Sequence, residues 1–394
     1  MSRKVYVTGV GMIPFAKPGA SASYDQMGAL AGRAALDDAG IAYDKVEQAY
    51  AGYVYGDSTC GQMALYQLGM TGIPVFNVNN NCSTGSTALF LGRQAIESGA
   101  AECVLVLGFE QMSPGALGSV FKDRPSPFAP FDAVTDKLID MPELPLALRY
   151  FGGAGQAHMN KYGTPLSAFA KIRAKASRHA ANNPLALLRK VVTPEDVLES
   201  PPLWPGVMTR LMACPPTCGA AAAVLVSEEF ARRHGLKADV FIAAQAMTTD
   251  RPGTFDSGDM MRLVGYDMTR AAADKVYAQA GIGPDDIDVV ELHDCFAHNE
   301  LLTYEGLRLC PEGGADKFIN DGDNTYGGKV VTNPSGGLLS KGHPLGATGL
   351  AQCYELTHQL RATAGERQVA GARVALQHNL GLGGACVVTL YQAA

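Results

Sequence analysis

DAGIAYDKVE at residues 38–47 and QAGIGPDDID at residues 279–288 are the stretches that decide the predicted fold of this chain. Each one closes a helical pattern at a glycine, Gly40 or Gly281, and then leads through a short turn into an apolar run. A glycine just past the last turn is a common way for a helix to end. Because the same helix, turn and strand occur twice, the sequence predicts two similar halves related by internal duplication.

The segments around these stretches alternate between strand-like and helical patterns, which favours an α/β fold. The turn and helix after Cys82 have a counterpart after His343, and the strand at 103–107 has one at 374–377. We therefore expect one turn from each half to lie at the interface between the halves. The predicted strands are 5–10, 46–54, 73–78, 103–107, 220–226, 287–292, 374–377 and 386–390, and the predicted helices are 24–39, 86–96, 230–234 and 299–309.

The chain length of 394 residues favours more than one domain. The alternating pattern stops between residues 112 and 208, where glycine and proline cluster, so this segment is predicted to be an insertion. The expected organisation is a first half at 1–111 and 209–237, an inserted loop domain at 112–208 that binds the substrate, and a second half at 238–394.

Composition narrows the class of protein. A net charge of −6 argues against general nucleic-acid binding, and no apolar run approaches the roughly 20 residues that span a bilayer, so membrane insertion is not expected. Nine cysteines without regular spacing are typical of reduced thiols, and residues 1–9 run into a strand-like segment without a signal peptide. These observations predict a cytoplasmic protein.

One stretch reverses the overall charge. From Leu144 to Pro194 there is no aspartate or glutamate, which favours a polyphosphate ligand over the alternative of a solvated helix face. The four residues predicted to bind substrate are Lys171, Arg173, Lys175 and Arg178, and the other cations of the stretch are Arg149, Lys161, Arg189 and Lys190.

Cys82 is the predicted nucleophile. It follows three asparagines and precedes a small, polar helix start, where free amides and the helix dipole would lower the pKa of a thiol. Gly85 is expected to keep the approach to the sulfur open. The alternative is a buried structural cysteine, which is the commoner role for a free thiol.

His343 is the predicted base. Gly342, Gly346 and Gly349 surround it and would allow a tight turn, and Pro344 would stiffen that turn. A histidine held there could take the thiol proton or donate to a thioester oxygen; the alternative is a capping or core histidine. The glycine spacing is not that of a dinucleotide-binding loop.

Two further segments could complete the site. His293 and Cys295 follow the strand at 287–292, where the cysteine could carry a second proton or be a buried structural thiol. The segment 378–385 is a glycine-rich turn that could present a backbone N–H to an oxyanion, or be a plain hairpin. Cys214 and Cys218 are a single pair of cysteines without a second pair at ligand spacing, so no metal site is expected.

The order of these motifs along nearly the whole chain resembles that of the thiolases, and most closely the sterol carrier protein X-type thiolases. The matching segments are the Cys82 turn, HDCF at 293–296, NPSGG at 333–337, the turn at 342–349 and the closing 378–385. The resemblance implies a five-layered α-β-α-β-α fold of two halves with an inserted loop domain that holds coenzyme A. It also implies a dimer or dimer of dimers that pairs through the first half, and a role in fatty acid or sterol side-chain degradation.

The chain departs from ordinary thiolases at Asn379, which stands where those enzymes place an acid/base cysteine. The resemblance to the sterol carrier type transfers that role to Cys295. His343 with His293, directly or through water, would then stabilise one thioester oxyanion, and the backbone N–H groups of Cys82 and Gly381 the other, with Asn379 supporting the turn. Because the sequence stops at Ala394 without an appended sterol-carrier module, lipid transfer by such a module is not expected.

The resulting prediction is an acyltransferase that cleaves a 3-oxoacyl-CoA by thiolysis, or runs the reverse Claisen condensation, through an acyl-Cys82 intermediate. Coenzyme A is a co-substrate and no cofactor is expected. Three alternatives stay open. A thiolase-fold aldolase acting on β-hydroxyacyl-CoA would not need Cys82, a condensing enzyme of the ketosynthase kind would use an acyl carrier, and an acyl-CoA-binding protein would lack a reactive Cys82.

Overall fold

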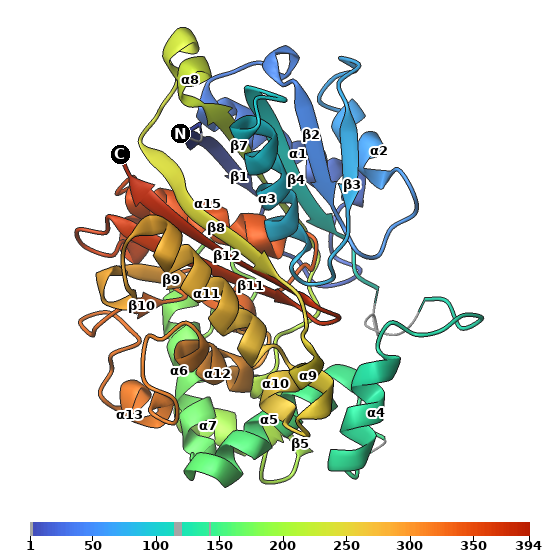
Figure 1. Ribbon diagram of the computed structural model, residues 1–394, viewed down its shortest axis with the longest axis vertical. Coiled ribbons are helices and arrows are strands. Elements are labelled where there is room, and N and C mark those ends of the chain that lie inside the picture. The colour runs from blue at the N-terminus through green and yellow to red at the C-terminus, as the bar shows by residue number, and fades with distance from the viewer. Residues whose placement is uncertain (1–2, 114–119, 142) are drawn as a thin grey trace.

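The computed structural model describes residues 3–113, 120–141 and 143–394 (Figure 1). The first half is a five-stranded sheet in the order β1-β7-β4-β2-β3, in which the pairs of β7 are antiparallel and those of β2 are parallel. Its elements are β1 (Val5–Met12), α1 (Tyr24–Ala39), β2 (Gln48–Gly52), β3 (Val75–Val78), α3 (Thr84–Glu97), β4 (Cys103–Glu110) and β7 (Gly219–Ser227).

The second half repeats this topology element by element. Its sheet runs β8-β12-β11-β9-β10, with antiparallel pairs around β12 and parallel pairs around β9. Its elements are β8 (Val240–Thr248), α11 (Tyr266–Ala280), β9 (Val289–Glu291), β10 (Val331–Thr332), α15 (Thr348–Leu360), β11 (Val374–Gly381) and β12 (Ala385–Ala393). The predicted duplication is confirmed: α1 and α11 end at Gly40 and Gly281, which have φ values of 73° and 70°.

The helices and strands form five layers. α3 and α15 contact each other and strands of both halves, so they form the central layer. α1 covers β1, β7 and β4 on one outer side, while α11 covers β8 and β12 on the other. The two halves join into one ten-stranded sheet through the pairing of Tyr6 with Phe241. The expected α-β-α-β-α arrangement of two similar halves is therefore confirmed.

The segment predicted as an insertion lies between β4 and β7 and is mostly helical. The matching connection in the second half is only the turn between β11 and β12. Helices α5 and α6 of the insertion pack against α12 of the second half, so the insertion contacts the opposite half of the chain. The elements of the insertion are α4 (Ala129–Leu138), α5 (Leu146–Tyr162), α6 (Leu166–Ala181), α7 (Pro194–Glu199), β5 (Pro202–Trp204) and β6 (Met208–Thr209). The helix α12 of the second half spans Ala297–Gly306.

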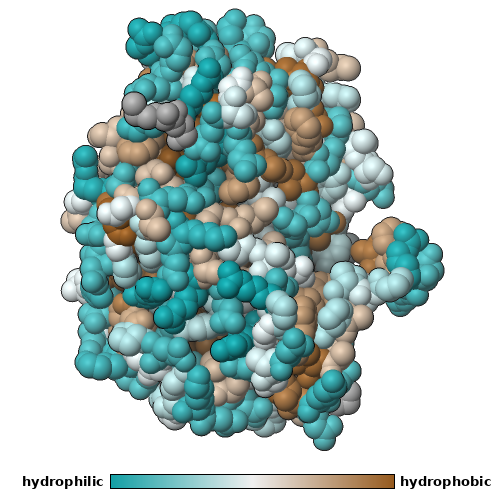
Figure 2. Space-filling model, viewed as in Figure 1, coloured by the Kyte–Doolittle hydropathy of each residue, from teal (hydrophilic) through white to brown (hydrophobic). Residues whose placement is uncertain are grey.

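Short helices complete the described structure: α2 (Cys60–Tyr66), α8 (Glu228–His234), α9 (Pro252–Asp256), α10 (Met260–Leu263), α13 (Ala315–Asn320) and α14 (Gly337–Ser340). None of the helices in the described ranges is long and apolar enough to cross a bilayer. Figure 2 shows a largely hydrophilic face interrupted by hydrophobic patches.

One predicted boundary is wrong in a way that affects the site. Residues 378–385 were expected to form a turn, but β11 continues to Gly381 and pairs with β12 along its whole length. His378 and Asn379 are therefore buried strand residues, and the turn is confined to 382–384. The glycine-rich composition hid the ladder because glycine is depleted in most strands.

Candidate functional site

The Cys82 turn is shaped by the small polar residues around it. Asn81 has a positive φ of 51°, a conformation that asparagine tolerates better than most residues. The hydroxyl of Ser83 donates to the carbonyl of Asn80 (2.8 Å), and that of Thr84 donates to the carbonyl of Asn81 (2.6 Å). These bonds fold the chain back sharply between β3 and α3 and place Cys82 just before the helix.

Glycines let this turn contact the His343 turn directly. A Cβ atom added at Gly85 would lie 2.8 Å from the carbonyl oxygen of Gly346, and one at Gly349 would lie 2.3 Å from the backbone nitrogen of Ser86. The expected close backbone approach at Gly346 and Gly349 is present. Gly85, however, does not keep an approach open, since it is the contact surface for the turn of the other half.

Three of the predicted site residues meet at this junction. The ligand-type atoms of Cys82, His293 and His343 lie within 4.8 Å of one another, and the two imidazole rings are 5.0 Å apart with an interplanar angle of 83°. Both histidines are buried, while Cys82 is half-buried. Side chains that are 261 residues apart in sequence thus share one small volume, as the duplicated topology predicted.

The hydrogen bonds of His343 define its tautomer. The hydroxyl of Thr348 donates its one hydrogen to the carbonyl of Pro344 (3.0 Å), so it must accept a hydrogen from Nδ1 of His343 (2.7 Å). Nε2 of His343 therefore carries a lone pair. This atom is buried and has no hydrogen-bond partner among the described residues, as a base awaiting a proton requires.

The resting site is uncharged. Burial, followed by the nearby charge of Glu110, raises the pKa of Cys82 to about 12, and burial lowers the pKa of His343 to about 3. A backbone hydrogen bond lowers the pKa of the thiol in the predicted direction, but desolvation of the sulfur outweighs it, so the net pKa is raised rather than lowered. A thiolate must form by proton transfer when substrate binds.

Cys295 lies in the same sulfur-rich region. Burial, then the neighbouring thiols of Cys214 and Cys82, raises its pKa well above the usual range. The backbone nitrogen of Cys214 donates to the carbonyl of Cys295 (2.9 Å), and Ala213 forms a bridge with Phe296. Sequence reasoning could not place Cys214 here, because Cys295 is 81 residues away and no motif joins the two cysteines.

Buried carboxylates hold the turns that carry the histidines, and sequence reasoning missed them. Glu110 accepts hydrogen bonds from the backbone nitrogens of Val54 (3.1 Å), Tyr55 (2.9 Å) and Gly346 (3.0 Å). Burial raises the pKa of Glu110 to about 7.

A second carboxylate ties the two histidine segments to each other. Glu291, two residues before His293, forms a buried ion pair with Lys341, two residues before His343 (3.1 Å). Truncating one partner of such a buried pair is typically costly, at about 3–5 kcal/mol. The pair therefore fixes the relative position of the two imidazoles.

Gly381 and Asn379 lie against the nucleophile turn. A Cβ atom at Gly381 would lie 2.3 Å from the carbonyl oxygen of Asn80 and 3.1 Å from the backbone nitrogen of Ser83. The amide nitrogen of Asn379 donates to the carbonyl of Cys82 (3.1 Å) and contacts Nδ1 of His293 (3.1 Å). The closing strand thus reaches both Cys82 and His293.

The basic stretch differs most from its prediction. Lys175 is buried and bonds to Glu300 and to the hydroxyl of Tyr304 (3.1 Å), and Arg173 is buried and donates to Ser340 (2.8 Å). These two residues do not form a surface anion site. The acceptors come from the second half of the chain, so the local absence of acids was misleading.

The remaining cations of the stretch divide into two sets. Lys171 donates to Asn320, Arg149 pairs with Asp136, and Lys161 pairs with Glu312 (3.1 Å). Arg178, Arg189 and Lys190 are exposed. Arg178 lines a surface hollow with Arg367, and of the four predicted substrate-binding residues it is the exposed one.

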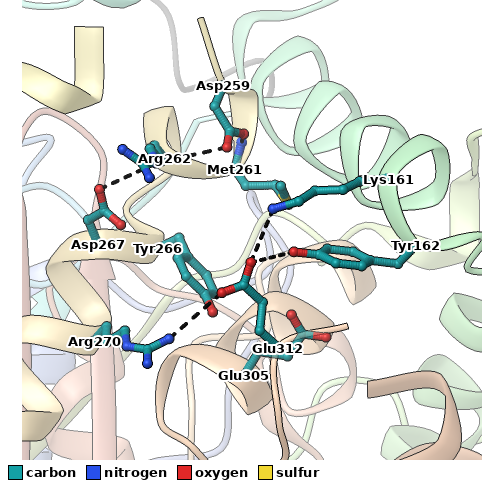
Figure 3. A pocket seen from close by; sticks show the side chains of 10 residues that line it. All are labelled: Lys161, Tyr162, Asp259, Met261, Arg262, Tyr266, Asp267, Arg270, Glu305 and Glu312. Carbon is teal, nitrogen blue, oxygen red and sulfur yellow. Dashed lines mark hydrogen bonds and ion pairs between the residues drawn. The ribbon is translucent and has the colours of Figure 1, made fainter. Parts of the chain in front are cut away.

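A separate pocket lies between α5, α10 and α11 (Figure 3). Its hollow of about 340 Å³ is lined by Lys161, Arg262 and Arg270, whose charges face carboxylates from the same lining. Lys161 and Arg270 both point toward Glu312. Because the lining holds three cations and four carboxylates, this pocket does not favour a polyphosphate, and it contains none of the clustered cysteine and histidine residues.

Comparisons with known proteins identify relatives over almost the entire chain. Residues 5–186 match the family model described as thiolase, N-terminal domain, and residues 254–391 match thiolase C-terminal domain-like. The chain is 57% identical over 396 residues to sterol carrier protein 2 of Oryctolagus cuniculus, which covers 99% of this chain and 72% of that protein.

A more distant relative and a solved structure extend the comparison. The chain is 32% identical over 395 residues to acetyl-CoA acetyltransferase of Methanothermobacter thermautotrophicus, covering 99% of both chains. The structure titled Ltp2-ChsH2(DUF35) aldolase superposes with a TM-score of 0.84 and covers 100% of this chain and 98% of that one. At 22% identity this last likeness shows the fold alone.

Proposed function

Because the chain belongs to the thiolase family, we propose that it transfers acyl groups between coenzyme A thioesters through a covalent acyl-Cys82. The observation that carries this proposal is the junction of Cys82, His293 and His343 within 4.8 Å, with an unpartnered lone pair on Nε2 of His343. A nucleophile and a base close to each other are what covalent acyl transfer requires.

In the first stage, Nε2 of His343 takes the proton of Cys82, and the sulfur bonds to the keto carbon of a 3-oxoacyl-CoA. The bond between the keto carbon and the α-carbon then breaks, and the thiol of Cys295 gives its proton to the departing carbon. Acetyl-CoA or propionyl-CoA leaves. His293 and His343 would face one thioester oxyanion, and the N–H groups of Cys82 and Gly381 the other.

In the second stage, the thiolate of Cys295 takes the proton of free coenzyme A, whose sulfur attacks the acyl carbon on Cys82. The Cys82–acyl bond breaks, and His343 returns its proton to the Cys82 sulfur. The product is a shortened acyl-CoA, and the same steps in reverse perform Claisen condensation. A cluster of neutral thiols suits this exchange, because each can give and regain one proton.

The test is intact-protein mass spectrometry after incubation with acetyl-CoA or acetoacetyl-CoA, followed by peptide mapping. We expect an acetyl group on Cys82 that free coenzyme A removes. Cys82→Ala should abolish the adduct, whereas Cys214→Ala, which removes a neighbouring thiol without an assigned role, should retain it. An adduct that persists in Cys82→Ala would overturn the assignment. No adduct despite coenzyme A binding would favour an aldolase or an acyl-CoA-binding protein.

We also propose that the protein pairs with a second copy of itself through the outer edge of the first half. β3 pairs only with β2 among the described strands, so its other edge is open. Large apolar side chains surround it: Met63, Tyr66, Met70 and Phe76 are 50%, 51%, 80% and 45% exposed. An open strand edge beside apolar residues is a typical association surface.

The oligomeric state tests this surface. Phe76→Glu should shift the mass measured by light scattering from a dimer toward a monomer. Leu138→Glu, at an exposed apolar residue on α4 in the inserted segment, is the matched control and should leave the mass unchanged. A wild-type protein that is a monomer at micromolar concentration would contradict the proposal.

A further inference from the structure

We propose that Asn379 is a positioning residue that fixes His293 in the tautomer with hydrogen on Nε2, so that the two histidines of the site present opposite groups. His343 then offers a lone pair and His293 an N–H. Only the catalytic consequence rests on the proposed acyl transfer; the tautomer follows from hydrogen bonds alone.

The first step is the orientation of the Asn379 amide. The carbonyl of Cys82, which can only accept, lies 3.1 Å from Nδ2 of Asn379. On the other side, Oδ1 lies 2.9 Å from the hydroxyl of Ser86. Exchanging the two amide atoms would set an oxygen against the Cys82 carbonyl, so the orientation shown is the favourable one.

The second step fixes the Ser86 hydroxyl as a donor to Asn379. Nε2 of Gln377 donates to the Ser86 oxygen (2.7 Å) and to the carbonyl of Gly349 (2.7 Å). The carbonyl of Gly349 can only accept, so it fixes Nε2 on that side of the Gln377 amide, and Oε1 accepts from the hydroxyl of Tyr391. The single hydrogen of Ser86 is therefore free to point at Oδ1 of Asn379. All of these side chains are buried, so water does not offer other partners.

The third step extends this series of hydrogen bonds to His293. Nδ2 of Asn379 lies 3.1 Å from Nδ1 of His293 and has a hydrogen available beyond the one given to Cys82. Nδ1 must then accept, and a neutral imidazole carries its hydrogen on the other nitrogen, Nε2. Burial, followed by the proximity of His343 and His378, lowers the pKa of His293 well below the usual value, so the ring stays neutral.

The tautomer of His293 decides whether the cluster of Cys82, His293 and His343 suits an oxyanion or a metal ion. Cys82, His293 and His343 have the donor types and spacing of a three-ligand metal site. With Nδ1 of His293 bonded to Asn379 and Nε2 protonated, only Cys82 and His343 retain free lone pairs. The amide thus favours an N–H aimed at a developing oxyanion and disfavours capture of a thiophilic metal ion.

The experiment is nitrogen NMR of the full chain labelled with ¹⁵N-histidine, with His293→Asn used to assign the signal. We expect wild-type His293 to show hydrogen on Nε2. In Asn379→Asp the carboxylate can only accept, so the hydrogen should move to Nδ1. Ser86→Ala removes a hydrogen bond of the same amide but keeps the Cys82 carbonyl contact, so this control should retain the Nε2 hydrogen.

A second readout does not require resonance assignment. Asn379→Asp should bind Co²⁺ about tenfold more tightly than wild type, detected by thiolate-to-cobalt absorption, because it frees a second imidazole lone pair. Wild-type His293 with hydrogen on Nδ1 would overturn the inference, as would an Asn379→Asp variant with the wild-type tautomer. Neither measurement uses an acyl donor, so failure of acyl transfer would leave both interpretable.

Discussion

At the scale of single residues, the unusual feature of the site is a nucleophile that rests as a neutral thiol. Burial raises the pKa of Cys82 to about 12. Below that pH the thiolate fraction grows about tenfold per pH unit. We therefore expect the rate of Cys82 alkylation by iodoacetamide to rise steadily between pH 6 and 9, measured by peptide mapping with Cys82→Ser as the blank. A plateau across pH 6–8 would show a preformed thiolate–imidazolium pair instead.

The charge of Glu110 should lower the rate of Cys82 alkylation at high pH. Its charge is the second cause of the raised Cys82 pKa, and its own pKa is raised to about 7 by burial. Glu110→Gln should therefore alkylate faster than wild type at pH 8.5, where the wild-type carboxylate is charged, and at an equal rate at pH 5.5, where it is protonated. If Glu110 had a purely structural role, Glu110→Gln would change the alkylation rate equally at both pH values.

Cys295 is predicted to matter more for carbon–carbon chemistry than for acylation. Cys295→Ala should still form acetyl-Cys82 from acetyl-CoA with a smaller loss of rate, because a thiolate leaves more readily than a carbanion and depends less on the proton of Cys295. Cleavage of acetoacetyl-CoA should fall by about 10²–10⁴, the usual contribution of a positioned acid or base. Stopped-flow and mass measurements separate the two steps. Equal loss of both would argue against a distinct role for Cys295.

The site residues could be predicted when a local signal marked them. Cys82 and His293 stand at strand-to-helix turns, and His343 stands at the turn between α14 and α15. Each turn leads into a helix, and this position is visible in sequence. Thr348 and Glu110 were missed because their function depends on partners in other segments, and Lys175 was misplaced for the same reason. A charge in sequence has no visible counter-charge until folding brings one, here Glu300, beside it.

At the scale of elements, the site depends on how closely α3 and the His343 turn can approach. Gly85→Ala would place a Cβ 2.8 Å from the backbone oxygen of Gly346, and backbone yields less readily than a side-chain end. We expect a loss of about 1–3 kcal/mol in the free energy of unfolding, measured with urea. Because displacements near 1 Å can cost about 10² in rate, adduct formation should fall comparably.

The matched control lies in the same helix. Gly92→Ala would place its Cβ 3.0 Å from a methyl of Val106, a side-chain atom rather than backbone. Its stability should change less, and its rate of adduct formation should stay near wild type. If Gly92→Ala lost activity as severely as Gly85→Ala, tight packing of α3 in general, rather than the contact between the two turns, would explain the effect.

The elements themselves were largely readable from sequence. α1 spans the predicted 24–39, and α3 begins two residues before the predicted 86 because Ser83 and Thr84 turn the chain early. The extent of β11 was not readable, since its final residues, Asn379 to Gly381, have low strand propensity. Its pairing with β12 and its buried contacts with the Cys82 turn hold it extended.

At the scale of the whole molecule, duplication creates a buried interface rich in titratable groups. Burial lowers the pKa of His179, His343 and His378 to about 3 and that of His298 to about 4. Below their unfolded value of about 6.5, the unfolded chain binds more protons than the folded one. These histidines therefore contribute stability that is present above pH 6.5 and is lost as the pH falls.

Two buried carboxyl groups act in the opposite direction. Burial raises the pKa of Glu110 to about 7, and burial with the charge of Glu300 raises that of Asp294 to about 8. Their stabilising contribution is full below the unfolded pKa of about 4 and is lost as the pH rises through 7 and 8. Four histidines act against two carboxyl groups, so below pH 6.5 the effect of the histidines on stability is the larger one. The thermal midpoint should therefore be highest near pH 6.5 and fall on both sides. Scanning calorimetry from pH 5 to 8.5 checks this, and Glu110→Gln should flatten the alkaline decline. A midpoint that keeps rising to pH 8 would show that these carboxyl groups are ionised in the folded protein.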